Sequence, residues 1–177
     1  MIKSKKSNKY TKYFIFFYKS DIILNMEIKI IVNSKDLDNI NALFKDLFNS
    51  EKKYDCSLDE CPNNFFNNKI GIEGTILLTL WDKDIAIGFL YGQILNTPNY
   101  CYKNGLGSLE LLFIKDPYRK RGLASKLILE FEKWLKSQKI YNYEVCCYNK
   151  NEAAINLYKT NGFKNLKSTF RKIIKND

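Results

Sequence analysis

A short basic loop in this sequence has the residue types that bind an anionic group. Residues 114–125 read IKDPYRKRGLAS, so an apolar run ends in a loop and a helix-like pattern follows. The loop carries three consecutive cations, Arg119, Lys120 and Arg121. A helix N-terminus presents unpaired N–H groups and a partial positive charge, which together hold anions such as phosphate. Gly122 would let the backbone approach that anion, and Ser125 would offer a hydroxyl in the first helical turn.

The same segment is also compatible with an ordinary strand-to-helix turn whose basic side chains are solvated. It lacks the Gly-x4-Gly-Lys-Ser/Thr spacing of a Walker loop and the Gly-x-Gly-x-x-Gly spacing of a dinucleotide site. The loop alone therefore indicates an anionic ligand and excludes these two classes of nucleotide site.

Proton transfer falls to a small set of residues, because the sequence contains no histidine. This excludes a Ser-His-Asp triad, a Cys-His pair and every histidine metal ligand. Glu110 is the one acid in the apolar run 108–115, where burying a carboxylate is costly unless it has a partner or a role. Tyr158 lies seven residues beyond Asn151, about two helical turns, so both occupy one helix face. The alternatives are a solvent-facing strand residue for Glu110 and a core aromatic for Tyr158.

The five cysteines stand at positions 56, 61, 101, 146 and 147. An odd number with one adjacent pair is a poor disulfide framework, so we expect reduced, buried thiols of a cytosolic protein. Cys56 and Cys61 have loose metal-like spacing, but no second ligand pair lies nearby, and we expect no metal. A covalent acyl-cysteine at Cys146 or Cys147 would lack an activating partner, so we expect core thiols there.

Alternating strands and helices must position these residues. We expect strands at 27–32, 75–81, 85–95, 108–115 and 141–148, with a final strand or two within 163–174. We expect helices at 37–48, 122–138 and 151–161, and a second short helix or a loop within 51–69. The segment 82–84 would be a hairpin turn, and Gly162 would cap the last helix. This order indicates a mixed α/β fold.

Two of the expected helices have an apolar stripe with spacings of three and four residues, which is typical of helices that pack on a core. In the first helix, the stripe comprises Leu37, Ile40, Leu43, Phe44 and Leu47. In the second, it comprises Ala124, Leu127, Ile128, Phe131, Trp134 and Leu135.

The composition indicates one folded domain preceded by a segment of different character. The chain has 177 residues, of which 45% are apolar and 15% aromatic, so it can bury a sizeable core. Its formal net charge is +10, and residues 1–25 contribute half of this excess. We interpret 1–25 as a basic N-terminal extension, weakly ordered or upstream of a start at Met26, and 26–177 as the single domain. No uncharged apolar run reaches the roughly 18 residues of a membrane span, and we expect a cytoplasmic protein.

Two motifs, RKRGLA at 119–124 and NEAAINLYKTNGF at 151–163, occur in this order with an expected strand between them. The first fits the pattern Arg/Gln-x-x-Gly-x-Gly/Ala, and the second fits Asn-x-x-Ala-x-x-x-Tyr-x-x-x-Gly-Phe. These are signatures of the GNAT superfamily of acetyl-CoA-dependent N-acetyltransferases, which the chain resembles over about residues 108–163.

The resemblance implies an α/β (α+β) fold with a mixed, mostly antiparallel twisted sheet, splayed between its fourth and fifth strands and flanked by helices. Acetyl-CoA would lie in the gap as co-substrate. The backbone of Leu112, Phe113 and Ile114 would pair with its pantetheine arm, and Asn151 and Tyr158 would contact the cofactor from the other side. The remaining cofactor contacts, around the pyrophosphate, would come from Arg119, Lys120, Arg121, Gly122, Leu123, Ala124 and Ser125.

The resemblance also assigns the two proton-transfer roles. Tyr158 would be the general acid for the departing thiolate, and Glu110 would contact or deprotonate the amine, directly or through water. The amine would attack acetyl-CoA directly in a ternary complex.

The expected acceptor is a small cationic amine, because Asp55, Asp59 and Glu60 form an acidic cluster in the segment that caps the acceptor site in this family. Acetylation of protein N-termini or lysines is the alternative. A non-catalytic acyl-CoA-binding module and an RNA-associated basic protein, the latter resting on residues 1–25, are alternatives from other classes. We expect no nucleic-acid and no membrane partner, and a homodimer is compatible with the sequence.

Overall fold

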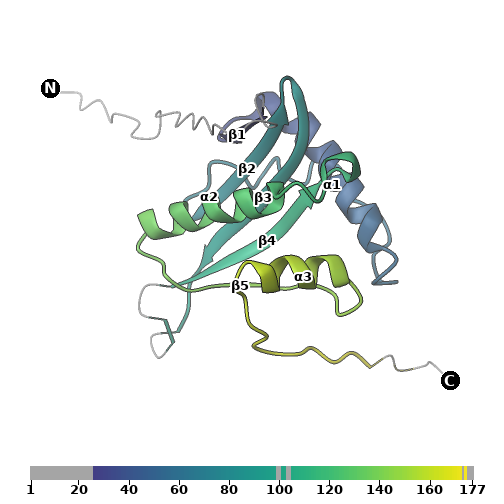
Figure 1. Ribbon diagram of the computed structural model, residues 1–177, viewed down its shortest axis with the longest axis vertical. Coiled ribbons are helices and arrows are strands. Elements are labelled where there is room, and N and C mark those ends of the chain that lie inside the picture. Colours follow the sequence, from purple (N-terminus) through teal and green to yellow (C-terminus); the bar gives the residue numbers. More distant parts are fainter. Residues whose placement is uncertain (1–25, 99–100, 103–104, 173, 175–177) are drawn as a thin grey trace, which may run out of the picture. The chain divides into compact units, whose positions relative to one another are not determined.

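The computed structural model describes residues 26–98, 101–102, 105–172 and 174 (Figure 1). The expected extension at 1–25 lies outside these residues. The chain divides into two compact units, Met1–Cys146 and Cys147–Asp177. The prediction of a single domain over 26–177 stays a prediction.

The first unit contains a five-stranded sheet whose strands follow their order in the sequence. β1 (Met26–Ile30), β2 (Thr75–Asp82), β3 (Ile85–Leu95) and β4 (Leu106–Ile114) are antiparallel neighbours, and β5 (Tyr143–Val145) runs parallel to β4. This mixed, mostly antiparallel sheet confirms the fold class predicted from the sequence.

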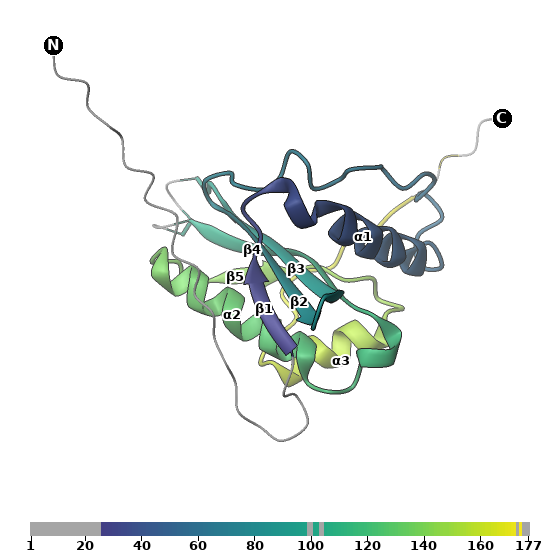
Figure 2. The ribbon, with the colours of Figure 1, turned by 90° about the horizontal axis from the view of Figure 1, so that it is seen from above.

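Two helices cover opposite faces of this sheet (Figure 2). α1 (Leu37–Glu51) buries the apolar stripe predicted for it. α2 (Leu123–Ser137) lies so close to the other face that a Cβ on Gly92 would be 2.4 Å from the Phe131 ring. Glycine at this position of β3 is therefore required by the close approach of the helix. Short 3-10 helices precede the two helices, at Ser34–Asp36 and Asp116–Tyr118.

The segment between α1 and β2 forms turns rather than a second helix. Its aromatic pair closes the α1 face of the sheet. Phe66 is fully buried and packs edge-on against Phe89 and Tyr91 of β3, while Phe65 stacks on Phe44 of α1 with ring centroids 4.0 Å apart. This loop thus packs on β3 at Phe89 and Tyr91, which lie opposite Phe113 and Leu111 of β4.

The two strands on either side of the predicted gap differ from their expected bounds. β4 begins at Leu106, two residues early, because Gly107 packs within the sheet between Leu135 and Tyr143 instead of ending a loop. β5 has three residues rather than the predicted 141–148, because β4 pairs with it only as far as Leu109.

The buried stripe of α2 begins one residue earlier than predicted. Leu123 is buried, whereas Ala124 and Trp134 are only half-buried. The other stripe residues, Leu127, Ile128, Phe131 and Leu135, are buried as expected.

The second unit contains α3 (Glu152–Thr160), which has a defined cap at each end. The Oδ1 atom of Asn151 accepts a hydrogen bond from the N–H of Ala154. At the other end Gly162 has a left-handed φ of 85°, and a Schellman motif closes the helix. The predicted helix and its glycine cap are therefore confirmed.

The strand or two predicted within 163–174 is wrong for the residues of this segment that the structure describes, which have no regular secondary structure. Leu166 and Phe170 are 72% and 95% exposed. In a strand these two side chains would share one face, with the polar Ser168 between them. The described residues of the segment pair with none of the five strands of the sheet, so that face packs on nothing.

Candidate active site

A β-bulge in β4 sets the position of Glu110. Tyr91 of β3 lies opposite Leu111, but the next residue, Gly92, lies opposite Leu109, so Glu110 has no register partner on β3. A bulge places two consecutive side chains against one on the neighbouring strand and re-aims one of them. Glu110 is consequently exposed within an otherwise apolar strand.

The bulge turns Glu110 toward the face of the sheet that α1 covers. Leu111 packs against the buried cluster that contains Tyr91 and the apolar stripe of α1. Gln93, two residues from Tyr91 on the same face of β3, donates a hydrogen bond to Glu110. Glu110 and Leu111 therefore share this face. In a regular strand Leu109 and Leu111 would both point away from Glu110, but with the bulge only Leu109 does.

Polar and aromatic groups surround the Glu110 carboxylate. The Nε2 atom of Gln93 donates to its Oε1 atom at 2.9 Å. Burial, together with the charge of Glu110, raises the pKa of the Tyr91 phenol. The Nζ atom of Lys69 lies 4.8 Å from the ring centroid of Phe65 and 5.9 Å from that of Tyr91. No salt bridge among the residues that the structure describes involves Glu110, so its second oxygen is available to an amine.

Among the described residues, no strand pairs with β4 beyond Leu109 on the side where β5 lies, and we call this stretch the open edge of β4. Its pairing with β5 covers residues 107–109 only, whereas its pairing with β3 continues to Ile114. The sheet is thus splayed between its fourth and fifth strands, as predicted. An unpaired strand edge can pair with an extended ligand. Leu112, Phe113 and Ile114 lie along this edge, and their pairing with pantetheine stays a prediction.

The loop before α2 has the backbone geometry of an anion site. Lys120 and Gly122 have left-handed φ values of 59° and 72° on either side of Arg121. Such alternation turns successive N–H groups toward one point. Gly122 is the N-cap of α2, contributes no side-chain cap, and has nothing within 4 Å of its Cβ position. The first helical turn includes Leu123, Ala124 and Ser125. No side chain at position 122 therefore covers the N–H groups of this turn.

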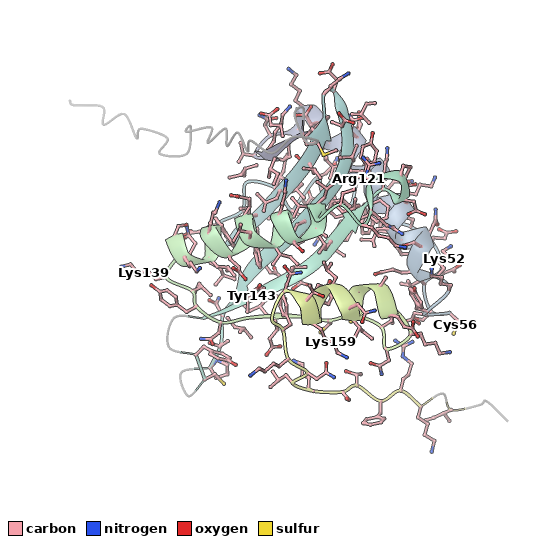
Figure 3. The ribbon with its side chains drawn as sticks, viewed as in Figure 1. Lys52, Cys56, Arg121, Lys139, Tyr143 and Lys159 are labelled. Atoms are coloured by element: carbon pink, nitrogen blue, oxygen red, sulfur yellow. The ribbon has the colours of Figure 1, made fainter. Side chains whose placement is uncertain are left out.

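Two cations of this loop make contacts that hold the loop itself. Arg119 donates from Nε to the carbonyl of Ile114 at 2.8 Å and pairs with Asp116 at 2.8 Å. Arg121 donates from Nη2 to the carbonyl of Pro117 at 2.9 Å (Figure 3). Both arginines thus have a structural role in addition to the anion-binding role predicted for them, which stays a prediction.

The other two predicted site residues, Asn151 and Tyr158, lie on α3 in the second unit. Asn151 is the N-cap of the helix, and its Oδ1 atom accepts a hydrogen bond from the N–H of Ala154 at 3.2 Å. The Tyr158 ring packs edge-on against Phe163, with centroids 5.4 Å apart, and is half-buried. Every residue of α3 is described, and none of them is fully buried. The roles of both residues toward acetyl-CoA stay predictions.

The acidic cluster at 55–60 is divided in the structure. Asp55 is buried, and its Oδ1 atom accepts hydrogen bonds from the N–H and the hydroxyl of Ser57 at 3.0 and 2.7 Å. This is a local turn in which the carboxylate replaces a backbone acceptor. Asp59 and Glu60 are exposed. Asp55 thus has a structural role, and only the other two acids keep their carboxylates at the surface.

Sequence reasoning missed Gln93 and Tyr91 as neighbours of Glu110. One signal could have found Gln93, because it is the only amide side chain in the apolar run 85–95. Finding its contact with Glu110 needed the register of β3 against β4, and the bulge sets that register.

The cysteines are less buried than expected. Cys56, Cys101, Cys146 and Cys147 are exposed, so the prediction of core thiols at 146 and 147 is wrong. The two follow the last residue of β5, where strand pairing has ended. No disulfide links the five cysteines, all of which the structure describes. Within the same described residues, no group of Cys, Asp and Glu is arranged to hold a metal ion, and no helix has the length and apolar character to cross a membrane.

Comparison with known proteins agrees with this geometry. Residues 38–163 match the sequence model of the acetyltransferase (GNAT) family. No curated protein sequence matches the chain. The chain belongs to the acetyltransferase (GNAT) family, and by class it is an acyltransferase enzyme.

Solved structures share the fold at low sequence identity. An aminoglycoside N-acetyltransferase in complex with CoA is 18% identical with a TM-score of 0.67, over 85% of this chain and 95% of that one. An aminoglycoside acetyltransferase from an uncultured soil metagenomic sample, in complex with trehalose, is 13% identical with a TM-score of 0.71, over 88% and 100%. A ribosomal-protein-alanine N-acetyltransferase from Brucella melitensis biovar Abortus 2308 is 14% identical with a TM-score of 0.62, over 84% and 99%. Since both small-molecule and protein acetyltransferases are among these structures, the fold alone does not select the acceptor.

Proposed function

We propose that this protein transfers the acetyl group of acetyl-CoA to a primary amine, which attacks directly in a ternary complex. One observation about β4 carries the proposal. The Glu110 carboxylate lies at the bulge, and the pairing of β4 with β5 ends at the preceding residue, Leu109. A carboxylate base and an open strand edge thus meet at one point of the sheet. Membership of the acetyltransferase (GNAT) family supports the same activity.

Acetyl-CoA would extend along the open edge of β4. The amides of its pantetheine arm would pair with the backbone of residues 112–114, as an added strand does. Its pyrophosphate would accept hydrogen bonds from the N–H groups of residues 120–125, where the helix N-terminus and the left-handed residues favour an anion. The contacts of Arg119 with Ile114 and Asp116 would hold the end of β4 and the following loop in the positions that bind the two parts of acetyl-CoA.

The reaction needs three proton transfers. The amine arrives mostly protonated, and Glu110 would take one proton from it, directly or through water. The neutral nitrogen then bonds to the acetyl carbon, the carbon–sulfur bond breaks, and the thiolate of CoA would take up a proton from Tyr158. The nitrogen would lose its second proton, which returns through water to the Tyr158 phenolate, and Glu110 would release the first proton to solvent. A phenol, with an ordinary pKa of about 10, is a suitable donor to a thiolate of similar basicity.

A small cationic amine is the acceptor that the surroundings of Glu110 favour. A carboxylate attracts an ammonium group, and Glu110 is exposed and makes no salt bridge among the described residues. The ring faces of Phe65 and Tyr91 already hold the Lys69 ammonium, so the attraction for the acceptor comes from Glu110. The likeness of fold to aminoglycoside acetyltransferases is consistent with this acceptor class.

Turnover of acetyl-CoA over a panel of amines tests the proposal, with free thiol as the readout. The panel holds polyamines, aminoglycosides, amino acids and a peptide with N-terminal alanine. We expect turnover with at least one polycationic small amine. Glu110→Gln should lower kcat/KM for it by about 10² or more, the usual contribution of a positioned base. Glu27→Gln, on β1 at the opposite edge of the sheet, is the matched control and should leave the rate unchanged.

The remaining outcomes separate the alternatives. Turnover confined to the peptide would assign a protein acceptor. Tight acetyl-CoA binding in calorimetry without thiol release from any amine would identify a non-catalytic acyl-CoA-binding module and overturn the proposal.

A further inference from the structure

The hydrogen bond between Gln93 and Glu110 joins two residues that regular strand pairing would keep apart. In the register of β3 and β4, Gln93 lies opposite Ser108, and Glu110 is the extra residue of the bulge. The bulge brings the Glu110 carboxylate within 2.9 Å of the Gln93 amide nitrogen. Gln93 is half-buried near the end of β3, whereas Glu110 is exposed. The amide is thus the better fixed member of the pair.

An exposed glutamate that makes no salt bridge among the described residues has several rotamers of similar energy. A donor from a neighbouring strand selects one of them. A general base needs such a fixed position relative to the proton that it takes.

Other charged and titratable groups also face Glu110. Tyr91 of β3 interacts with it electrostatically. Lys69, from the loop between α1 and β2, lies over the Tyr91 ring. On β5, Glu144 lies opposite Ser108, two residues before Glu110. Of these side chains, Gln93 is the one that donates a hydrogen bond to the Glu110 carboxylate.

We propose that Gln93 is a positioning residue, which holds the Glu110 carboxylate in one orientation so that the acceptor amine meets it at a fixed place. This inference rests on the proposed function, in which Glu110 contacts or deprotonates the amine. It adds a residue outside both sequence motifs to the catalytic arrangement.

The test replaces the amide by a side chain of similar length without a donor. Gln93→Met should lower kcat by about tenfold or more, part of the 10² to 10⁴ that a positioned base contributes. Gln93→Glu should lower kcat at least as far, because a like charge replaces the donor and turns the Glu110 carboxylate away. The KM for acetyl-CoA should stay unchanged, so the loss is confined to the step that uses the carboxylate. Gln138→Met, at the exposed C-terminal end of α2, is the matched control and should alter none of these quantities.

A second readout does not depend on activity. The side-chain scalar couplings of Glu110, measured by NMR of carbon-13-labelled protein without substrate, should report one rotamer in the unmodified protein and several in Gln93→Met. The same single rotamer in both proteins would overturn the inference. So would a normal kcat of Gln93→Met when Glu110→Gln is strongly impaired, and this outcome would leave the proposed function intact. Full activity of Glu110→Gln would instead remove Glu110 from the proposed function, whatever Gln93 does. If Gln93→Met fails to fold, Gln93→Glu, which keeps the shape of the side chain, provides the same comparison.

Discussion

The hydroxyl of Tyr143 donates a hydrogen bond to Oε1 of Glu132 at 2.8 Å and so ties β5 to α2 (Figure 3). The Tyr143 ring also packs edge-on against Phe131 of the same helix. Because β5 pairs with β4 over three residues only, these contacts to α2 supply much of what holds the short strand in place. The gap in which acetyl-CoA is proposed to lie therefore depends on a contact outside it.

Tyr143→Phe should destabilise the protein without changing its fold. The variant keeps the ring and its packing on Phe131 but leaves the Glu132 carboxylate without its phenol donor. A hydrogen bond to a charged group contributes about 1.5–3 kcal/mol to the free energy of unfolding, which denaturant unfolding would detect. Tyr141→Phe is the control, because Tyr141 is 72% exposed and precedes the strand. Equal stability of the two variants would show that the hydrogen bond does not hold β5.

The same pair predicts a dependence of stability on alkaline pH. Burial, followed by the hydrogen bond and the charge of Glu132, raises the pKa of Tyr143 well above the ordinary value of about 10. The folded state therefore keeps this proton at a pH where the unfolded chain loses it. The stability that Tyr143 contributes is fully present below pH ~10 and is lost as pH rises toward the higher pKa of the folded state. The free energy of unfolding should fall less steeply above pH ~10 in Tyr143→Phe than in the unmodified protein.

The proposed role of Gly122 in binding acetyl-CoA can be separated from the backbone strain that a substitution at this position causes. Gly122 and Gly162 both have a left-handed φ, and a Cβ on either would meet nothing within 4 Å. Gly122→Val and Gly162→Val should therefore cost a similar amount of stability, from the unfavourable backbone conformation. Only Gly122→Val should weaken acetyl-CoA binding, by more than tenfold or about 1.4 kcal/mol, because its side chain would occupy the approach to the proposed pyrophosphate site. Calorimetry that gave both variants the affinity of the unmodified protein would contradict this placement.

The sequence predicted the fold well where a periodic apolar pattern met a packing partner. The α1 stripe from Leu37 to Leu47 is buried as expected, because helical periodicity specifies which face meets the sheet. The strand predicted within 163–174 was wrong, because its apolar residues have no packing partner: the described residues of the segment pair with no strand of the sheet, and Leu166 and Phe170 are exposed. The short length of β5 could not be predicted from residues 141–148 either. It depends on the residue at which β4 stops pairing with β5.

The candidate site was predictable residue by residue but not as an arrangement. Glu110 is conspicuous as an acid in an apolar strand, and Gly122 stands in a recognisable motif. The bulge that aims Glu110 at Gln93 is an insertion of one residue into a strand pair, and no residue type in β4 encodes it by itself. Asp55 shows the reverse case, since its carboxylate was assigned to an acceptor site and serves a local turn with Ser57.

The proposed proton donor can be tested by removing one oxygen atom. Tyr158→Phe keeps the ring, its edge-on contact with Phe163 and the caps of α3, and it deletes the hydroxyl. If that hydroxyl protonates the leaving thiolate, kcat should fall by about 10² or more, a typical general-acid contribution. Affinity for acetyl-CoA should change much less, because most of the proposed contacts are to backbone N–H groups. A loss confined to kcat marks an interaction made mainly in the transition state.

Tyr141→Phe serves as the control for this experiment as well, because it removes a phenol hydroxyl from an exposed position outside α3. The rate must be limited by chemistry for the comparison to hold, so acetyl transfer is measured in a single turnover with enzyme in excess over acetyl-CoA. Near-normal transfer by Tyr158→Phe under these conditions would remove Tyr158 from the mechanism. Water would then have to protonate the thiolate, and the proton that Glu110 takes from the amine would be the one transfer assigned to a side chain.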